Sequence, residues 1–439
     1  MSQLRAPVLF GLVSGSSSLM AGQLALVGIG FAQTLAGTRL LGADHFGAWA
    51  LILSLTTLTN MFLSFRTSEA FTSYWVEARL VNPSAEGALV SSAAWAEVAT
   101  KTAALVALCL VGPLVLRAAQ APPGAETALT IVAGARFLSF FDPIWFSVLR
   151  SDRSIGVLTM QPIVVALLQL CLSVAFCLFW NGHVLAFAAA MLVAQAASLA
   201  WKMVGVRHRL ARSLFGPQGL VLSPWKTFQT RLLHRGFWRM MTAGYFSSCL
   251  SSAVKEGDGV LIGLLGGAVD VGYYRLAKSM AGLVQTAAQS LSTLLFQHFA
   301  ELVAAGDATG IRRFVGRIAP LMAIVALLGA GAVALCIRPL ISTVFGARYL
   351  LALPPFYVLL LGISISSALA WVSPLLTMLR RMREVLILNL LTFAIFVLVL
   401  AATVHGFGPL APAIALSAAW GVGHLAGLWC AIGALKRTR

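Results

Sequence analysis

The sequence has little charge, and acidic residues are the scarcest part of it. Only 10% of its 439 residues are charged, with 14 Asp and Glu in all, whereas 59% are hydrophobic. Soluble domains carry about 25% charged residues. The deficit excludes a soluble globular enzyme, a disordered chain and a free nucleic-acid-binding protein, because each of these needs a polar surface or chain. We therefore expect no nucleic acid among the partners.

Motifs for metal or catalytic chemistry are missing as well. The six cysteines lie in or beside apolar stretches, and none forms a CxxC pair, so they are interpreted as small hydrophobic residues of the membrane core. No D-x-D motif occurs, and no predicted outer connection is long enough to hold a catalytic domain. We expect neither an enzyme nor a bound metal or other cofactor.

What the sequence has instead is a series of long apolar runs. A membrane-spanning helix needs about 20 apolar residues, and strands of a membrane barrel would alternate rather than run apolar without interruption. The runs predict an all-α polytopic membrane protein with about twelve transmembrane helices, at residues 14–37, 44–65, 87–112, 126–149, 156–180, 183–204, 238–264, 271–300, 314–337, 352–378, 384–404 and 408–434.

The positive charges are distributed unevenly between the two sides of these helices. If the N-terminus is cytoplasmic, 22 of the 31 Lys and Arg residues fall on the cytoplasmic side, Lys202 among them. Five lie within spans, and four lie on the opposite side, namely Arg39, Arg117, Arg338 and Arg348. This asymmetry follows the positive-inside rule. It explains the net charge of +17 and predicts that both termini are cytoplasmic.

The two halves of the chain resemble each other. Leu40-Leu41-Gly42 with Gly47 is echoed by Leu264-Leu265-Gly266 with Gly272, and Pro143 in the fourth helix is echoed by Pro374 in the tenth. We therefore predict a parallel pseudo-two-fold repeat of two six-helix lobes, residues 1–204 and 238–439, joined by a basic cytoplasmic linker, 205–237. Two such lobes enclose a central cavity, which is the geometry of alternating access.

The same residues carry a family resemblance. The run from Arg39 through Gly42 and Gly47 to Trp49 is similar to a signature that follows the first helix of the polysaccharide transporter (oligosaccharide flippase) family. Asp258 to Gly263, followed by Val271-Gly272-Tyr273-Tyr274, resembles that family's signature on its seventh and eighth helices. The family belongs to the multidrug/oligosaccharidyl-lipid/polysaccharide exporter superfamily. The resemblance covers the whole chain in helix number and layout.

The resemblance implies a function and a location. The chain would flip an undecaprenyl-diphosphate-linked oligosaccharide from the cytoplasmic to the periplasmic leaflet of the bacterial inner membrane, for exopolysaccharide, capsule or O-antigen export. Membrane lipids would be further partners, and a polysaccharide polymerase or other assembly protein is a candidate partner. The coupling ion and the sugar composition stay open. A sugar diphosphate cannot cross hydrocarbon unsolvated, so a wet cavity with cations is expected.

Charged residues inside spans are costly and are functional candidates by default. The cavity cations predicted to bind substrate are Lys101, Arg136, Lys255, Arg275 and Lys278, and the supporting acids are Glu97, Glu256 and Asp258. Spacing predicts local pairs of Glu97 with Lys101 and of Lys255 with Asp258. One of Arg275 and Lys278 is expected to pair with an acid of the seventh helix and to leave the other, preferably Arg275, for diphosphate.

The remaining candidates are interpreted as structural. Arg39 is expected to cap and anchor the end of the first helix, and Gly42, Gly47, Gly266 and Gly272 to serve turns and close packing. Tyr274 belongs to the signature. His298 and His424 lie in or near spans and are suited to proton relay, although the more ordinary expectation is a satisfied polar residue.

Four alternatives remain open. A drug or metabolite antiporter of the same superfamily would share the fold but is expected to place acids in its cavity. A flippase for the peptidoglycan precursor is a near neighbour. A membrane-embedded glycan polymerase, ligase or glycosyltransferase would need the catalytic loop that this sequence lacks. A membrane scaffold without transport would leave the buried charges without a purpose.

Overall fold

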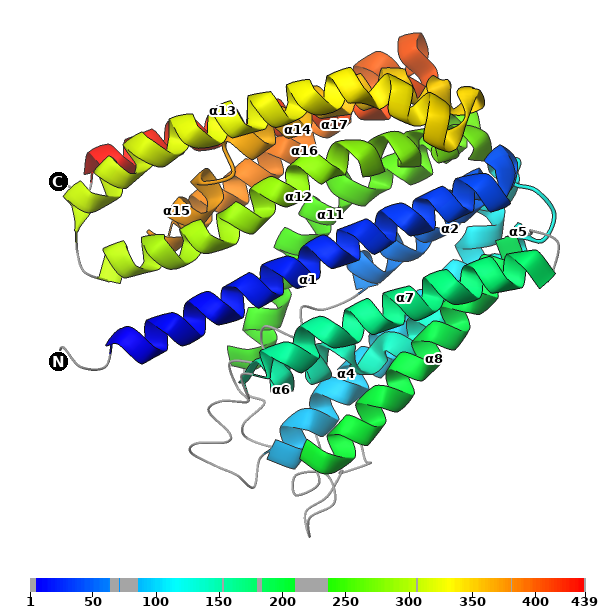
Figure 1. Cartoon of the computed structure of the whole chain (residues 1–439), viewed down its shortest axis with the longest axis horizontal. Helices are drawn as coiled ribbons and strands as arrows, with labels where there is room; N and C mark the ends of the chain where they lie inside the picture. Colours follow the sequence, from blue (N-terminus) through cyan, green and yellow to red (C-terminus); the bar gives the residue numbers. More distant parts are fainter. Residues whose placement is uncertain are drawn as a thin grey trace. The chain divides into compact units, whose positions relative to one another are not determined.

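The chain is almost entirely helical. The computed structural model describes residues 5–63, 71, 86–151, 154–179, 184–209, 236–304, 307–379 and 381–437. Within these residues the backbone forms helices and short connections and no strand (Figure 1). The predicted basic linker lies mostly outside the described residues, since α8 ends at Arg209 and α11 begins at Gly236.

The helices follow the apolar runs of the sequence closely. In chain order they are α1 (Arg5–Leu40), α2 (Gly42–Leu63), α4 (Glu86–Ala118), α5 (Ala125–Phe137), η2 (Leu138–Phe141), α6 (Asp142–Ser151), α7 (Ile155–Phe179), α8 (Val184–Arg209), α11 (Gly236–Gly266), α12 (Ala268–Ala304), α13 (Ala308–Leu340), η4 (Ile341–Phe345), η5 (Ala347–Ala352), α14 (Leu353–Ala368), α15 (Val372–Met378), α16 (Met382–Phe407), η6 (Gly408–Leu410) and α17 (Ala411–Arg437). Every predicted span coincides with one of these helices or with a consecutive group of them.

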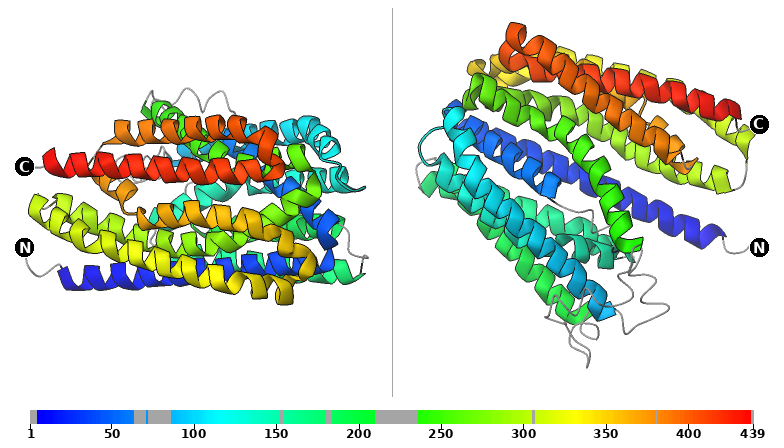
Figure 2. Two further views of the ribbon diagram at one scale, coloured as in Figure 1. Left: turned by 90° about the horizontal axis from the view of Figure 1, so that it is seen from above. Right: turned by 180° about the vertical axis from the view of Figure 1, so that it is seen from behind.

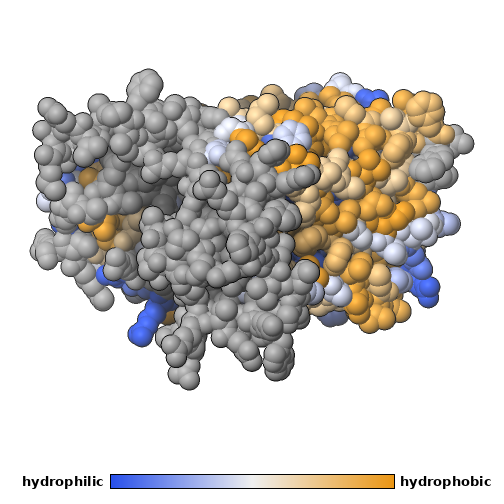
Figure 3. Space-filling view, turned by 90° about the horizontal axis from the view of Figure 1, so that it is seen from below, coloured by the Kyte–Doolittle hydropathy of each residue, from blue (hydrophilic) through white to orange (hydrophobic). Residues whose placement is uncertain are grey.

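Length and composition suit these helices to a bilayer. Among the described residues, eight stretches are long and apolar enough to cross a membrane, and one of them, 383–435, takes in both α16 and α17. Large apolar side chains also stand exposed, such as Leu110, Leu335 and Trp429. The described part of the surface in Figure 3 is broadly apolar. A soluble monomer rarely exposes so much apolar surface, whereas a lipid-facing one does, so the prediction of an all-α polytopic membrane protein is confirmed.

Two of the predicted helices are interrupted, and they are the same helix of each half. The run predicted at 126–149 forms α5, the short 3₁₀ segment η2 and then α6. The run predicted at 352–378 forms α14, a turn and then α15. Pro143 and Pro374 lie in the first turn of α6 and α15, where a proline costs no hydrogen bond. The prediction of single continuous helices is wrong here, but the interruptions support the repeat.

The contacts of the chain group it into two units. Unit 1 comprises Met1–Ala36, Ile52–Arg117 and Pro122–Cys249, and unit 2 comprises Gly37–Leu51, Ala118–Ala121 and Leu250–Arg439. Within unit 1, α8 packs against α5 and α7; within unit 2, α14 packs against α12, α13 and α17 (Figure 2). The predicted lobe boundaries at 204 and 238 stay a prediction.

Each unit has a hydrophobic core beside its interrupted helix. In unit 1 this core contains Phe141 and Trp145 from the η2–α6 region. In unit 2 it contains Trp371 and Leu375 from the α14–α15 region. Both tryptophans are at most 2% exposed. The interruptions are therefore held in place by packing and are not frayed helix ends.

Candidate functional site

Arg39 of the first signature joins two connections of unit 2. Its Nε donates to the carbonyl of Val344 at 2.6 Å and its Nη2 to that of Thr343 at 3.1 Å. These carbonyls belong to η4, the segment that follows α13. Arg39 therefore caps the end of η4 and not, as expected, the end of its own helix. Its contacts are structural, as predicted. Nearby, the Tyr349 hydroxyl donates to the carbonyl of Thr38 at 3.2 Å.

The signature glycines lie where backbones turn or cross. Gly42 has a φ of +75°, a conformation that side chains with a Cβ disfavour. A Cβ on Gly47 would stand 2.0 Å from the backbone oxygen of Ala268, and one on Gly272 would stand 3.1 Å from the Cα of Gly47. The start of α2 thus crosses the start of α12 in backbone contact. The interpretation of these glycines as turn and close-packing residues is confirmed.

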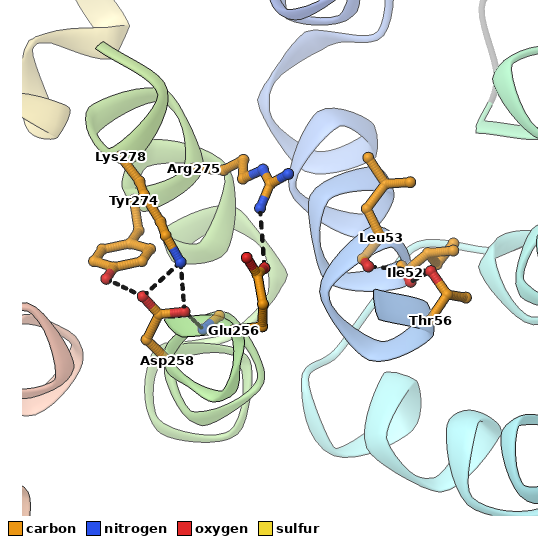
Figure 4. Close-up of polar contacts among 9 residues, drawn as sticks. Ile52, Leu53, Thr56, Glu256, Asp258, Tyr274, Arg275 and Lys278 are labelled. Carbon is orange, nitrogen blue, oxygen red and sulfur yellow. Dashed lines mark hydrogen bonds and ion pairs between the residues drawn. The ribbon is translucent and has the colours of Figure 1, made fainter. Parts of the chain in front are cut away.

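Asp258 is the centre of a buried polar network in unit 2. Its side chain is 2% exposed. It accepts hydrogen bonds from the Tyr274 hydroxyl at 2.5 Å and from the Lys278 ammonium at 2.9 and 3.1 Å (Figure 4). The backbone N–H of Gly259 donates to it at 2.7 Å. These donors satisfy both oxygens, which is the condition for keeping a charge in an apolar interior.

This network bears on two predictions. Lys278 from α12 neutralises Asp258, as expected for one of the two cations of that helix; the predicted pair of Lys255 with Asp258 stays a prediction, because the side chain of Lys255 lies outside the described residues. Arg275 also meets an acid, because its Nη1 lies 3.8 Å from Oε2 of Glu256 (Figure 4). The expectation that Arg275 is left over for substrate is therefore wrong in this arrangement. That second pair is longer and more exposed, at 35% and 23%, so it is the weaker of the two.

Unit 1 holds a second group of charges in its spans. Lys101 of α4 donates from Nζ to Oδ1 of Asn60 on α2 at 2.8 Å. Glu97, one turn earlier on α4, is 1% exposed, and its charge, like those of Arg136 and Asp142, acts on Lys101. The predicted coupling of Glu97 to Lys101 is thus present as an electrostatic interaction, while the hydrogen bond that Lys101 donates goes to the neutral amide of Asn60.

Lys202 has a partner that the sequence does not reveal. Its expected position on the cytoplasmic side stays a prediction, and its side chain on α8 is 3% exposed and forms an ion pair with Asp142. Asp142 begins α6, where the helix dipole favours a carboxylate. The acid inside the predicted span 126–149 was the available signal, because a charge within a span is costly and usually has a partner of opposite sign. Glu97, Lys101, Arg136, Asp142 and Lys202 are hereafter called the unit 1 charge cluster.

The interrupted helix of unit 2 carries neutral polar groups instead. The hydroxyl of Ser366 lies 3.1 Å from Nε2 of His424 on α17, and Nδ1 of His424 lies 2.8 Å from the carbonyl of Trp420. The expectation that His424 is a satisfied polar residue is confirmed; the side chain of His298 lies outside the described residues. The Ser367 hydroxyl and the Trp371 indole nitrogen are buried, and neither has a hydrogen-bond partner among the described residues.

Metal ligands do not gather in the part of the chain that the structure describes. Across these residues, no group of three or more His, Cys, Asp or Glu side chains is placed to hold a metal ion.

Solved structures with the same fold are transporters. The chain matches the lipid II flippase MurJ in an inward closed conformation, with 13% identity, a TM-score of 0.74 and coverage of 97% of this chain and 90% of that one. It matches an inward-facing multidrug resistance MATE family transporter of the MOP superfamily at 13% identity, a TM-score of 0.71 and coverage of 96% and 95%. It also matches the Vibrio cholerae MATE transporter VcmN in its bent form at 14% identity, a TM-score of 0.57 and coverage of 98% and 99%.

At these identities the likeness establishes the fold. No curated protein matches the sequence significantly. The family model described as "Polysaccharide biosynthesis protein" matches residues 12–302, which include both signatures, the unit 1 charge cluster and the Asp258 network. The chain therefore belongs to the polysaccharide biosynthesis protein family.

Proposed function

We propose that this protein flips an undecaprenyl-diphosphate-linked oligosaccharide from the cytoplasmic to the periplasmic leaflet of a bacterial inner membrane by alternating access. Membership of the polysaccharide biosynthesis protein family supports a glycan substrate. The fold shared with a lipid II flippase and with MATE transporters supports movement across the membrane in place of catalysis.

The observation that carries the proposal is the composition of the unit 1 charge cluster. Its described side chains include three cations, Lys101, Arg136 and Lys202, and two acids, Glu97 and Asp142. A span interior with more cations than acids is unfavourable unless an anion completes it at some stage of the cycle. The diphosphate of a lipid-linked sugar is such an anion.

The types of the two substrate-facing candidates suit a diphosphate. Arg136 offers a planar guanidinium that binds phosphate oxygens in two-point geometry, and Lys101 offers a point charge. Arg136 lies in the last turn of α5, just before the interruption by η2. Interrupted helices at matching positions of two repeats are where secondary transporters place their substrates. Lys202, already paired with Asp142, would hold the cluster together and not bind substrate.

The first experiment asks which leaflet holds the substrate. In a strain that lacks this protein, the undecaprenyl-diphosphate-linked sugar is tested with a membrane-impermeant glycan label. We expect the sugar to accumulate unlabelled until a plasmid-borne copy of the protein restores labelling. Normal labelling without the protein would overturn the proposal. If the strain instead lost resistance to cationic compounds, the antiporter function would replace it.

The second experiment tests the cluster itself. We expect Lys101→Gln and Arg136→Gln each to lower the rate of flipping by about tenfold or more, since a charge-assisted hydrogen bond contributes about 1.5 kcal/mol or more. Arg117→Gln is the matched control, because Arg117 is an exposed cation paired with Glu126, at side-chain exposures of 70% and 45%. Equal membrane levels are verified by immunoblot. Wild-type flipping in both cluster variants would refute the assignment.

A further inference from the structure

The end of α14 presents a histidine with an unusual set of partners. His424 projects from α17 toward the last turn of α14, where Ser366 meets its Nε2 atom at 3.1 Å. Its other ring nitrogen, Nδ1, lies 2.8 Å from the backbone carbonyl of Trp420. The helix stops two residues after Ser366, at Ala368, and resumes as α15 at Val372.

These partners determine which nitrogen carries the proton. A carbonyl oxygen only accepts hydrogen bonds, so Nδ1 must be the protonated nitrogen. In the neutral ring Nε2 is then an acceptor, and the Ser366 hydroxyl donates to it. A proton added to Nε2 would reverse that bond, because the ring would then donate to Ser366 Oγ. The hydroxyl hydrogen of Ser366 would have to find another acceptor at the end of α14.

The charged residues of the described elements around this ring lie toward the two ends of α17. The elements packed against α17 include α14, α15, α16 and η6, of which α14, α15 and η6 contain no charged residue. They also include α13, whose Arg312 donates to the carbonyl of Leu435 near the end of α17. On α16, Thr392 is level with Gly423, the residue before His424. Glu384 and Arg383 are then about 12 Å away along α16, and His405 about 20 Å, at about 1.5 Å of rise per residue. Lys436 and Arg437 of α17 itself are about 18 Å away by the same measure.

The interruption beside this ring contains polar groups that call for partners. The Ser367 hydroxyl and the Trp371 indole N–H have none among the described residues, although both side chains are at most 3% exposed. A buried donor without a partner costs about 1–3 kcal/mol. Water admitted to the interruption would satisfy both groups and would solvate an imidazolium ion at His424.

We propose that His424 is a proton-binding site and that its protonation accompanies hydration of the α14–α15 interruption. A proton from the aqueous phase forms a bond to Nε2, and no other covalent bond changes. Water beside the ring stabilises the cation more than the neutral ring, so proton binding and hydration stabilise each other. The use of this site to couple transport to protons rests on the proposed function; the site itself does not.

The direct test measures the ring without any substrate. The full chain labelled with ¹⁵N-histidine is reconstituted in lipid nanodiscs, and the ring nitrogens are followed by NMR against pH. We expect a neutral ring protonated at Nδ1 at alkaline pH and a new proton at Nε2 as the pH falls. His424→Gln assigns the resonance by removing it. If His424→Gln does not fold, Ser366→Ala assigns the resonance by shifting it. A ring protonated at Nε2 when neutral, or one that never titrates in the folded protein, would overturn the proposal.

The transport test separates this proposal from the proposed function. In wild-type protein we expect the flipping rate to change with pH by a factor on the order of tenfold per pH unit on one side of the profile, as a single essential proton requires. His424→Gln should remove that dependence, while His405→Gln, near the end of α16, should keep it. An unchanged profile in His424→Gln would refute the coupling role even if flipping is intact. Titration without any flipping would uphold the site and refute the proposed function.

Discussion

The interrupted helices of the two units share a backbone device and differ in chemistry. If Pro143 is aligned with Pro374, Arg136 corresponds to Ser367 and Asp142 to Ser373. In both units the residue that contacts the interrupted helix comes from the sixth helix of the repeat. Lys202 on α8 contacts Asp142, and His424 on α17 contacts Ser366. One interruption is therefore charged and the other neutral.

This difference shows how a repeat takes on two tasks. Ending a helix inside a bundle exposes backbone and side-chain polar groups, which must be satisfied in an apolar setting. In unit 1 an ion pair with a buried lysine meets that need, and cations outnumber acids among the described residues of the cluster, which suits an anion. In unit 2 neutral hydrogen bonds between described residues meet it only in part, which suits the proposed uptake of a proton with water.

The largest effect is expected from breaking the ion pair of the charged interruption. Lys202→Met should lower the free energy of unfolding by about 3 kcal/mol, because it leaves the Asp142 carboxylate without its buried partner. The double variant Lys202→Met/Asp142→Asn should recover most of that loss. Thermal unfolding in detergent measures both. If the double variant were as unstable as the single one, the cost would come from packing rather than from the unpaired charge.

A second contrast lies within unit 2, between its two ion pairs. Lys278→Met should cost about 2 kcal/mol, since it strips the buried Asp258 of its ammonium. Arg275→Met should cost less than about 1 kcal/mol, because its pair with Glu256 is long and partly exposed. The same unfolding assay compares the variants side by side. Equal losses would show that burial does not separate the two pairs.

The two tryptophans beside the interruptions offer a matched comparison. The indole N–H of Trp145 donates to Oε1 of Gln161 at 2.9 Å, and Trp145→Phe should cost about 1–2 kcal/mol by leaving that amide oxygen without its donor. Trp371→Phe removes an indole N–H that has no partner among the described residues, so its cost should be smaller. A larger loss for Trp371→Phe would mean that its N–H is satisfied in the folded protein.

The smallest effect is expected at the exposed start of α13, which carries neither interruption and serves as a reference. Asp307 accepts hydrogen bonds from the Gly310 N–H and the Thr309 hydroxyl. These bonds, the one from Gly310 first, hold the pKa of this carboxyl below its ordinary value of 3.8.

The sign of the pH effect follows from that lowered pKa. Stabilisation by Asp307 is complete above the pKa of the unfolded chain and is lost as the pH falls through the lower folded pKa. Asp307→Ala should therefore lower the melting temperature slightly at neutral pH, and the difference should vanish in strong acid. Melting curves against pH compare the two proteins, and a constant difference would exclude the carboxylate as its source.

Much of this architecture was readable from local patterns. Apolar runs predicted every span to within a few residues at most ends, because hydrophobic length is a property of consecutive residues. The signature glycines were also correctly interpreted, since a turn or a backbone contact demands glycine whatever lies opposite. The two interruptions were missed because their apolar content is continuous and each proline is compatible with the middle of a kinked helix as well as with the first turn of a new one.

The pairing of charges between helices was beyond local patterns. Spacing along one helix cannot reveal that Lys278 reaches Asp258 from the next helix. Hydropathy likewise cannot reveal that Lys202 on α8 is buried against Asp142. A buried charge takes whichever partner the packing of helices brings near, and that partner is usually distant in sequence.

By itself, the sequence determined a helical membrane protein with repeated halves, signature glycines at its crossings and a set of charges inside its spans. Only the tertiary structure decided where helices break, which charges pair and that one interruption is charged while the other is neutral. The physical reason is that hydrophobic length and backbone conformation are local quantities, whereas the satisfaction of a buried polar group depends on what a neighbouring helix presents to it.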